Sequence, residues 1–238
     1  MNLETKQIEA LLPEVRAEYL RRMTGGDGNL LRQVEEYTGS HTGKMLRPRM
    51  LLSAAATLGD EHLRSHRTLL LATAVEMLHN ASLLHDDVID RDLTRRGQPS
   101  VNARWNNTVA VLVGDYHLAS IMQLLSEIGD EAITQKFITT VKAMVEAELL
   151  AQEVTELQCS QMDENPCLLD TYLRIIDGKT ASLFALAAEL GNPAYRNYGL
   201  HYGRLFQLRD DVADGEATPF TDKLITQEEA ILKEIAPQ

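Results

Sequence analysis

Residues 69–90 read LLLATAVEMLHNASLLHDDVID, and this stretch decides the fold class. Its apolar residues recur at intervals of three and four, which is the spacing of one face of an α-helix. The residues in this pattern are Leu69, Leu70, Ala74, Met77, Leu78, Ala81 and Leu84. The stretch therefore predicts an apolar helix that packs in a protein interior and ends in a run of aspartates.

The same helical spacing continues along the rest of the chain, and β-branched residues do not alternate with polar ones for more than a few positions. Gly-rich or Gly–Pro sequences at residues 25–28, 97–100 and 191–193 fall between the periodic segments, where they predict a loop and two turns. We expect helices at residues 3–22, 29–38, 43–58, 61–86, 107–127, 130–158, 167–190, 194–213 and 222–235. Because the connections are short and none resembles a linker, the sequence predicts one all-α helical bundle that spans residues 1–238.

The composition is that of a globular protein with an acidic surface. Of its 238 residues, 44% are hydrophobic, and the formal net charge of −12 disfavours nucleic acid, whose binding depends on basic residues. The N-terminal segment lacks the apolar core of a signal peptide, and no run of about 18 apolar residues could cross a membrane. Cys159 and Cys167 match no disulfide or zinc pattern, so we expect free thiols. We therefore expect a cytoplasmic protein with no nucleic-acid partner and no transmembrane segment.

The string Asp-Asp-x-x-Asp occurs twice, at residues 86–90 and 210–214. On a helix the first and last aspartates of each motif share one face, while the second aspartate points about 100° away. Like charges at this spacing destabilise a helix, and carboxylate oxygens suit Mg²⁺, which adds waters and substrate phosphates to one or two carboxylates. The candidate metal ligands are Asp86, Asp87, Asp90, Asp210, Asp211 and Asp214.

Two other interpretations of the acidic motifs remain at this point. Solvated acidic helix ends are the simplest alternative, although they do not explain two copies that each follow a long apolar run. A di-iron carboxylate site is the other metal interpretation, but it is built from glutamates and Glu-x-x-His motifs on facing helices, which the aspartate motifs do not match.

Basic residues fall in three short groups that are ordered around the acidic motifs. Lys44 and Arg47 lie near the start of a predicted helix, where free N–H groups and the helix dipole also favour an anion. Arg95 and Arg96 follow the first motif, and adjacent side chains point in different directions, so they could serve two anions. Lys179 lies in a Gly-Lys-Thr sequence. Each group alone would be an ordinary surface charge, but together they predict a site for phosphate groups.

At six places the chain resembles the trans-isoprenyl diphosphate synthases, which are also called polyprenyl synthetases. The similar strings are GKMLRP at 43–48, EMLHNASLLHDDVID at 76–90, RRGQPSVN at 95–102, VGD at 113–115, GKTA at 178–181 and FQLRDD at 206–211. They follow the family's order and cover roughly residues 40–215. The resemblance implies a helical bundle of the isoprenoid synthase type, with a central cavity that two facing aspartate motifs line, and a homodimer.

The resemblance also implies roles for individual residues. The positions that match ligands of three Mg²⁺ ions are Asp86, Asp90 and Asp210, and those that match supporting carboxylates are Asp87, Asp211 and Asp214. The positions that match the allylic diphosphate site are Arg95, Lys179, Thr180 and Gln207. Those that match the isopentenyl diphosphate site are Lys44, Arg47, His79 and Arg96. The residues implied to take part in catalysis are Asp86, Asp90, Arg95, Lys179, Gln207 and Asp210.

The implied activity is a Mg²⁺-dependent, head-to-tail condensation of isopentenyl diphosphate with an allylic diphosphate to give a trans product. Mg²⁺ and basic side chains would stabilise the leaving diphosphate. The isopentenyl double bond attacks the allylic cation, and the departing diphosphate takes the proton, so no protein base is required. His79 could instead be a packed helix residue, and its family position is the reason to assign it to the isopentenyl site.

Two features qualify the resemblance. After the second motif, residues 215–220 lead directly into one amphipathic helix, and Lys223 is not assigned the family role of a lysine that contacts the allylic diphosphate. Before the first motif, Ala81 and Ser82 match positions at the floor of the product pocket, and Leu78 lies one turn further down. Because Ala81 and Ser82 are small, we expect a pocket that admits products longer than about fifteen carbons.

Three other functions are compatible with parts of this pattern. A noncatalytic or regulatory subunit that pairs with a full-length synthase is favoured by the shortened C-terminal segment. A class I terpene cyclase has the same fold but binds one substrate, so it does not need the residues matched to isopentenyl diphosphate. A purely structural helical protein leaves the matched polar residues unexplained. Activity of the purified chain alone separates the first alternative from a synthase.

Overall fold

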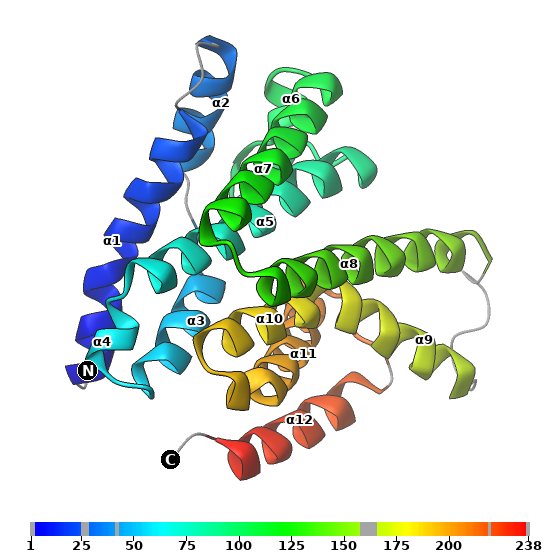
Figure 1. Cartoon of the computed structure of the whole chain (residues 1–238). Helices are drawn as coiled ribbons and strands as arrows, with labels where there is room; N and C mark the ends of the chain where they lie inside the picture. The colour runs from blue at the N-terminus through cyan, green and yellow to red at the C-terminus, as the bar shows by residue number, and fades with distance from the viewer. Residues whose placement is uncertain (1–2, 25–28, 41–42, 158–165, 219, 237–238) are drawn as a thin grey trace. The chain divides into compact units, whose positions relative to one another are not determined.

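The structure is a computed structural model that describes residues 3–24, 29–40, 43–157, 166–218 and 220–236. The loop expected at residues 25–28 lies outside them, as do Cys159 and the side chain of Cys167. The chain forms two compact units, Met1–Asp130 and Glu131–Gln238, and each is described by itself. Both units consist almost entirely of helices (Figure 1), so the all-α prediction is confirmed. The predictions of a single domain and of two facing aspartate motifs stay predictions.

The first unit is built around α5 (His66–Ile89), which packs against α1, α3 and α7. Every residue of α5 from Leu70 to Leu78 is buried, so its middle passes through the interior of this unit. The other helices of the unit are α1 (Leu3–Met23), α2 (Asn29–Ser40), α3 (Leu46–Ala56), α4 (Asp60–Leu63), α6 (Val101–Arg104) and α7 (Asn107–Ile128).

Helix α5 begins and ends later than the sequence predicted. Ser65 is its N-cap, and the Oγ atom of this serine accepts a hydrogen bond of 3.1 Å from the backbone N–H of Thr68. This cap divides the helix expected at 61–86 into α4 and α5, and the continuous apolar pattern hid it. At the other end the backbone N–H of Asp90 donates to the carbonyl of Asp86 over 2.8 Å. The first aspartate motif therefore forms the last helical turn.

The prediction that the chain has no strands is wrong in one place. β1 (Thr94–Arg95) and β2 (Gln98–Pro99) form a small antiparallel hairpin. Its turn residues, Arg96 and Gly97, have φ angles of 54° and 76°. Positive φ at both turn positions is typical of a type I′ hairpin turn. Strands of two residues are too short to show an alternating pattern, so the sequence suggested only a turn here.

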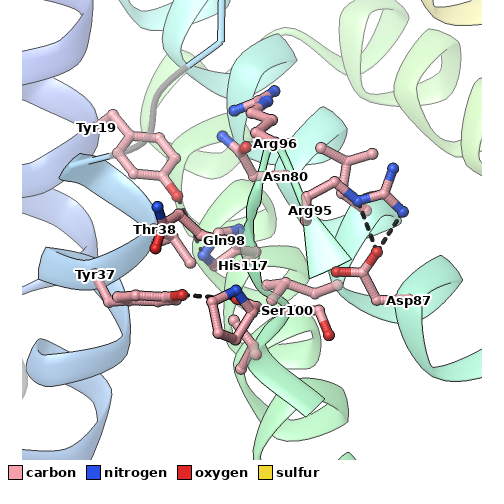
Figure 2. A pocket seen from close by; sticks show the side chains of 14 residues that line it. Tyr19, Tyr37, Thr38, Asn80, Asp87, Arg95, Arg96, Gln98, Ser100 and His117 are labelled. Atoms are coloured by element: carbon pink, nitrogen blue, oxygen red, sulfur yellow. Dashed lines mark hydrogen bonds and ion pairs between the residues drawn. The ribbon is translucent and has the colours of Figure 1, made fainter. Parts of the chain in front are cut away.

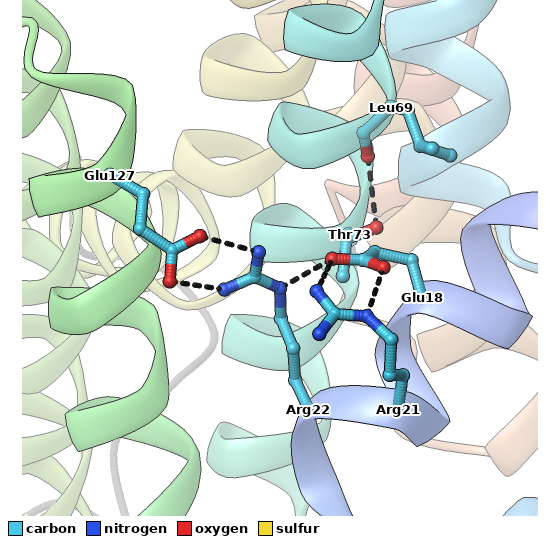
Figure 3. Close-up of polar contacts among 6 residues, drawn as sticks. All are labelled: Glu18, Arg21, Arg22, Leu69, Thr73 and Glu127. Carbon is cyan, nitrogen blue, oxygen red and sulfur yellow. Dashed lines mark hydrogen bonds and ion pairs between the residues drawn. The ribbon is translucent and has the colours of Figure 1, made fainter.

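A chain of ion pairs joins α1 to α7 within the first unit (Figure 3). Arg22 donates through Nε to Glu18 Oε1 over 2.7 Å and through Nη2 to Glu127 Oε2 over 2.7 Å. Arg21 Nη2 donates to the same Glu18 oxygen over 2.6 Å. The hydrogen bond from Arg21 is the main reason that the pKa of Glu18 falls to about 2. Glu18 is therefore ionised at neutral pH, and the network fastens α1 to α7.

By length and composition, α7 is the one described helix that could cross a membrane, with a mean hydropathy of 1.4 over an 18-residue window. One face of α7 is buried in this unit, where the helix packs against α5. The buried residues of that face are Ala110, Val113, Gly114, His117, Ile121, Leu124 and Leu125. The interior helix of a folded unit has the same length and hydropathy, so α7 is weak evidence for a membrane segment, and the expectation of no such segment stays a prediction.

The second unit packs its helices around α10 (Ser182–Gly191), in which residues 183–188 are all buried. Its other elements are α8 (Glu131–Leu157), α9 (Pro166–Ile176), the π-helical turn η1 (Asp177–Ala181), the 3₁₀ turn η2 (Pro193–Tyr195), α11 (Arg196–Asp214) and α12 (Thr221–Ile235).

The helix expected at residues 167–190 is interrupted by η1, which the sequence did not predict. At Gly178 this π-helical turn lies very close to α8. A Cβ atom built on Gly178 would be 2.3 Å from Ala147 Cβ and 2.7 Å from the carbonyl oxygen of Ala143. Only glycine fits this approach, and π-turns of this kind occur frequently at functional sites.

Candidate active site

The first aspartate motif turns one carboxylate inward. Asp87 has 3% exposure, whereas Asp86 is partly exposed and Asp90 is exposed. Arg95 donates through Nε to Asp87 Oδ1 over 2.7 Å, and its Nη2 donates to the same oxygen and to Asp92. Burial raises the pKa of Asp87, and Arg95 opposes that rise. The helix spacing thus separates a buried, paired carboxylate from two that lie nearer the surface.

Arg95 and Arg96 point in different directions, as expected for adjacent residues. Arg95 extends toward Asp87, and Arg96 lies apart from that pair (Figure 2). The guanidinium of Arg96 lies against Gly43, because a Cβ atom built on that glycine would be 2.5 Å from Arg96 Nη2. The left-handed backbone at Arg96 belongs to the tight turn after Arg95. The hairpin therefore presents two arginines to two different surroundings.

Three of the four residues assigned to isopentenyl diphosphate form one basic cluster. Arg47 Nη1 lies 3.2 Å from His79 Nε2. Burial lowers the pKa of Arg47 to about 10, and burial together with Arg47 and Arg96 holds the pKa of His79 well below its usual value. The ring of His79 is therefore neutral at neutral pH and can accept a hydrogen bond from Arg47. The fourth residue, Lys44, is exposed, and its backbone carbonyl accepts a hydrogen bond of 2.6 Å from Arg49 Nε.

Glu76 belongs to the same neighbourhood, although the sequence analysis assigned it no role. Its side chain is buried, and burial raises the pKa of its carboxyl while Arg47 and Arg96 lower it. Glu76 precedes His79 by one helical turn, so the two side chains lie on one side of α5. A carboxylate here offsets part of the positive charge of the cluster. The signal that could have revealed it is a single acidic residue within the buried stretch from Leu70 to Leu78.

The second aspartate motif ends α11 with the same pattern of burial. Asp211 has 8% exposure, whereas Asp210 and Asp214 are exposed. Gln207 Nε2 donates to Asp211 Oδ1 over 2.7 Å, and the hydroxyl of Tyr172 donates to Asp211 Oδ2. Gln207 precedes Asp210 by three residues, but the aspartate that its amide contacts is Asp211. Burial is the main cause of the raised pKa of Asp210, and the neighbouring carboxylates of Asp214 and Asp211 add to it. A bound cation would lower this pKa.

The π-helical turn η1 carries two further residues of the predicted allylic site. Thr180 Oγ1 donates to Gln207 Oε1 over 2.6 Å, so the structure brings these two predicted residues together. Lys179 Nζ lies 2.5 Å from Glu148 Oε2 on α8. A diphosphate that binds Lys179 must therefore compete with Glu148. Neither Glu148 nor Tyr172 was singled out in the sequence, because their importance depends on contacts between helices that are distant in the chain.

The donor atoms of the two motifs fit Mg²⁺. Among the residues that the structure describes, no group of three or more His, Cys, Asp or Glu side chains gathers closely enough to hold a metal ion. Mg²⁺ is usually bound by one or two carboxylates, with waters and substrate phosphates as its other ligands. Each motif offers two such carboxylates one turn apart, Asp86 with Asp90 and Asp210 with Asp214. The donor set therefore suits an ion that binds together with a diphosphate.

The residues assigned to product length lie along α5. Leu78 and Ala81 are buried within the first unit, and Ser82 is partly exposed. The hydroxyl of Ser82 donates to the carbonyl of His79 over 2.9 Å, as serine often does within a helix. The described contacts do not identify the floor of a product pocket, so this assignment stays a prediction.

A small pocket of about 70 Å³ lies beside the first motif, within the first unit (Figure 2). Asp87, Arg95 and Arg96 contribute to its wall, together with residues of α1, α2 and α7 that the sequence did not indicate. One of these is the buried His117, whose Nε2 lies 2.7 Å from Glu35 Oε1. The surroundings of Arg95 and Arg96 thus include a buried histidine–glutamate pair. No sequence pattern links residues so far apart.

Two helix ends that present paired aspartates, in an all-helical chain with nearby arginines and lysine, define the class of the isoprenoid synthases. Comparison with known proteins then identifies the family. The sequence matches the polyprenyl synthetase family over residues 28–225, and the chain belongs to that family.

Solved structures and a curated relative agree with this assignment. A decaprenyl diphosphate synthase from Rhodobacter capsulatus has a TM-score of 0.78 and 30% identity, covering 91% of this chain and 70% of that one. A polyprenyl synthase from Caulobacter crescentus CB15, complexed with calcium and isoprenyl diphosphate, has a TM-score of 0.75 and 32% identity, covering 87% and 63%. An all-trans-nonaprenyl-diphosphate synthase (geranyl-diphosphate specific) of Rhodobacter capsulatus is 38% identical over 194 residues, 78% of this chain. The chain spans 57% of the length of that relative.

Proposed function

We propose that this chain is a Mg²⁺-dependent prenyltransferase that condenses isopentenyl diphosphate with an allylic diphosphate, head to tail, into trans products. The observation that carries this proposal is the repeated carboxylate pair, Asp86 with Asp90 and Asp210 with Asp214, each at a helix end. The names of the similar proteins, nonaprenyl and decaprenyl diphosphate synthases, support the same chemistry. The small residue Ala81 supports a product pocket for chains of more than about fifteen carbons.

The aspartate motifs and their neighbours would hold the allylic diphosphate. Mg²⁺, for which three ions are expected, would neutralise the charge that develops on the departing diphosphate. The residues proposed to contact this diphosphate are Arg95, Lys179, Thr180 and Gln207. The buried second aspartates, Asp87 and Asp211, would act mainly by fixing Arg95 and Gln207 in place. This arrangement leaves the outer carboxylates to bind metal.

The basic cluster of the first unit would hold isopentenyl diphosphate. Arg47 offers a planar fork of donors that matches phosphate oxygens, and Arg96 lies close enough to act on the same group. The neutral ring of His79 can donate a hydrogen bond from its second nitrogen while it accepts one from Arg47. Lys44, which is exposed, adds a mobile positive charge. The isopentenyl double bond attacks the allylic carbon, and the released diphosphate takes the proton.

We also propose that the chain acts as a homodimer in the cytoplasm. Exposed apolar side chains recur along α8 at intervals of seven and four residues, Ile138, Val145 and Leu149, so they form one stripe. On α7, Leu112 and Met122 are 60% and 70% exposed. Apolar stripes of this kind are typical of interfaces between subunits. Sedimentation of the protein and of a Val145→Glu variant tests the proposal: the variant should be monomeric, and a monomeric parent protein would contradict it.

The main test is incubation of the purified chain with Mg²⁺, labelled isopentenyl diphosphate and a farnesyl or geranylgeranyl diphosphate starter. We expect a ladder of extended products that a chelator abolishes. Asp60, which is exposed and pairs with Arg64, supplies a matched control: Asp60→Ala should keep the ladder that Asp86→Ala loses. No incorporation with any starter would favour a noncatalytic subunit, and a cyclic product from the allylic substrate alone would favour a terpene cyclase.

Product length has its own test. Ala81→Phe would place a bulky ring where the structure has a small buried side chain. We expect the longest products to disappear and shorter ones to accumulate, as measured by chromatography of the dephosphorylated alcohols. An unchanged distribution in a folded Ala81→Phe variant would show that Ala81 and its neighbours do not limit the product.

A further inference from the structure

In the second unit, a chain of three ion pairs runs from the last helix to η1. Glu228 on α12 has 5% exposure, and its Oε2 lies 2.6 Å from Nδ1 of His201 on α11. Its other oxygen lies 3.5 Å from Arg204 Nη1. Arg204 then donates through Nε and Nη2 to both oxygens of Asp177, over 2.5 and 2.7 Å. One arginine therefore joins α12 to η1 through α11.

The contact between Arg204 and Asp177 fixes geometry as well as charge. Two parallel hydrogen bonds between a guanidinium and a carboxylate allow only one relative orientation of the two groups. Asp177, and to a smaller extent Glu228, raises the pKa of Arg204, so the arginine is charged under all ordinary conditions. Because Glu228 is buried, removing its charge would leave this side of Arg204 without compensation.

Asp177 is the first residue of η1, and Lys179 and Thr180 follow it by two and three residues. A π-turn is rare and occurs mostly as a single turn within an α-helix, so we look to its neighbours for what holds it. Here α11 supplies them at close range, because a Cβ atom built on Gly203 would be 2.5 Å from Ala181 Cα. Arg204 follows this glycine, so its ion pair with Asp177 forms beside this close approach of α11 and η1.

Helix α12 is held in place independently by apolar contacts. Leu224, one turn before Glu228, packs with Ile176 of α9 and Leu208 of α11 in a buried cluster. The partly buried Phe220 and Ile225 pack against the same cluster. The apolar face of α12 therefore docks on the unit, and Glu228 extends that face toward Arg204.

We infer that Glu228, acting through Arg204 and Asp177, positions η1 so that Lys179 and Thr180 are held ready for substrate. These three charged residues are positioning residues, since none of them is placed at the reacting groups. The role in substrate binding rests on the proposed prenyltransferase function. The mechanical coupling of α12 to η1 does not depend on it.

The test compares two adjacent glutamates of α12. Glu228→Gln keeps the size of the side chain and removes its charge. Glu229→Gln makes the same change at a partly exposed residue that pairs with Arg209 on the same neighbouring helix, at 2.7 Å. Hydrogen–deuterium exchange of the amides at residues 177–181 is the readout. We expect exchange at least about tenfold faster in Glu228→Gln and unchanged in Glu229→Gln.

Steady-state kinetics adds a second readout. We expect Glu228→Gln to raise the KM for the allylic diphosphate several-fold and to leave the KM for isopentenyl diphosphate unchanged. If Glu228→Gln does not fold, Arg204→Lys, which keeps the charge but loses the fork, replaces it. Unchanged exchange at residues 177–181 in the folded variant would overturn the inference. If the parent protein has no activity, the proposed function fails, while the exchange comparison still decides whether Glu228 holds η1.

Discussion

The two aspartate motifs share a sequence and a pattern of burial, but they differ in what the buried aspartate meets. In the first motif Asp87 pairs with a cation, Arg95, on the hairpin that follows α5. In the second motif Asp211 accepts hydrogen bonds from neutral donors, Gln207 and Tyr172. The helix repeat alone decides which carboxylate turns inward. The tertiary neighbours decide whether its charge is cancelled.

This difference predicts that substitutions at the two motifs will change the stability of the protein, and its pH dependence, to different extents, although the motifs look alike in the sequence. In the first motif, Arg95 neutralises one of the three aspartates. A bound metal therefore has less negative charge left to neutralise there. In the second, the donors to the buried aspartate are neutral, and burial, with smaller contributions from Asp214 and Asp211, raises the pKa of Asp210.

The largest effect is expected where the motifs are alike. Asp86→Ala and Asp210→Ala should each lower kcat roughly a thousandfold, because each removes a carboxylate that would hold metal against the leaving diphosphate. Steady-state assays at saturating Mg²⁺ and saturating substrates measure this loss. A variant of one motif that keeps nearly full activity would show that the two motifs are not equivalent in catalysis.

The next largest effect is on stability, and it is expected at the first motif. Arg95→Gln removes the cation from buried Asp87 and should lower the free energy of unfolding by about 2–3 kcal/mol at neutral pH. Urea titration measures the change. Arg64→Gln, which alters an exposed pair with Asp60, is the control and should change it by less than about 0.5 kcal/mol.

The same variant has a defined pH dependence. Burial already raises the pKa of Asp87, and removal of Arg95 raises it further. A carboxyl whose pKa is higher in the folded state takes up its proton more readily there, so stability is kept at low pH and lost as the pH rises through the folded pKa. The deficit of Arg95→Gln should therefore shrink between neutral pH and about pH 5. A deficit that grows on acidification would contradict the proposed cause.

The smallest effect belongs to the second motif. Tyr172→Phe removes one neutral donor from Asp211 but leaves Gln207 in place, so the loss should be about 1 kcal/mol. Because the lost donor is neutral and not a cation, this loss should depend on pH less steeply than the loss in Arg95→Gln. Urea titrations of both variants at two pH values make the comparison. Equal pH dependence in the two would show that the motifs respond alike.

The sequence predicted the parts of this site that depend on helix periodicity. The place of Asp86 and Asp90 on one side of α5, and the different direction of Asp87, follow from the repeat of the helix. The divergent directions of Arg95 and Arg96 also follow from their adjacency. These features are local, so a single segment carries the information that specifies them.

Other parts could not be predicted because they depend on contacts between distant segments. The π-turn at η1 requires Gly178 to approach α8, and that approach has no signature in the residues around it. The pairing of Lys179 with Glu148 and of Asp211 with Tyr172 likewise joins separate helices. Glu228 reads in the sequence as one charge of an amphipathic helix, and only the packing of α12 shows that it is buried.

The π-turn at η1 is also a place where the chain could lose one residue. A π-turn spans one residue more than the hydrogen-bonded turn of an α-helix, so η1 is a point where the chain holds a surplus residue. Deleting one residue between Asp177 and Ala181 would allow α9 and α10 to join as a single regular helix. Because η1 absorbs the surplus residue within one turn, the helices on either side would keep their faces, and only the residues of the turn, Thr180 among them, would change direction. A one-codon deletion could thus leave the fold intact and silence the site.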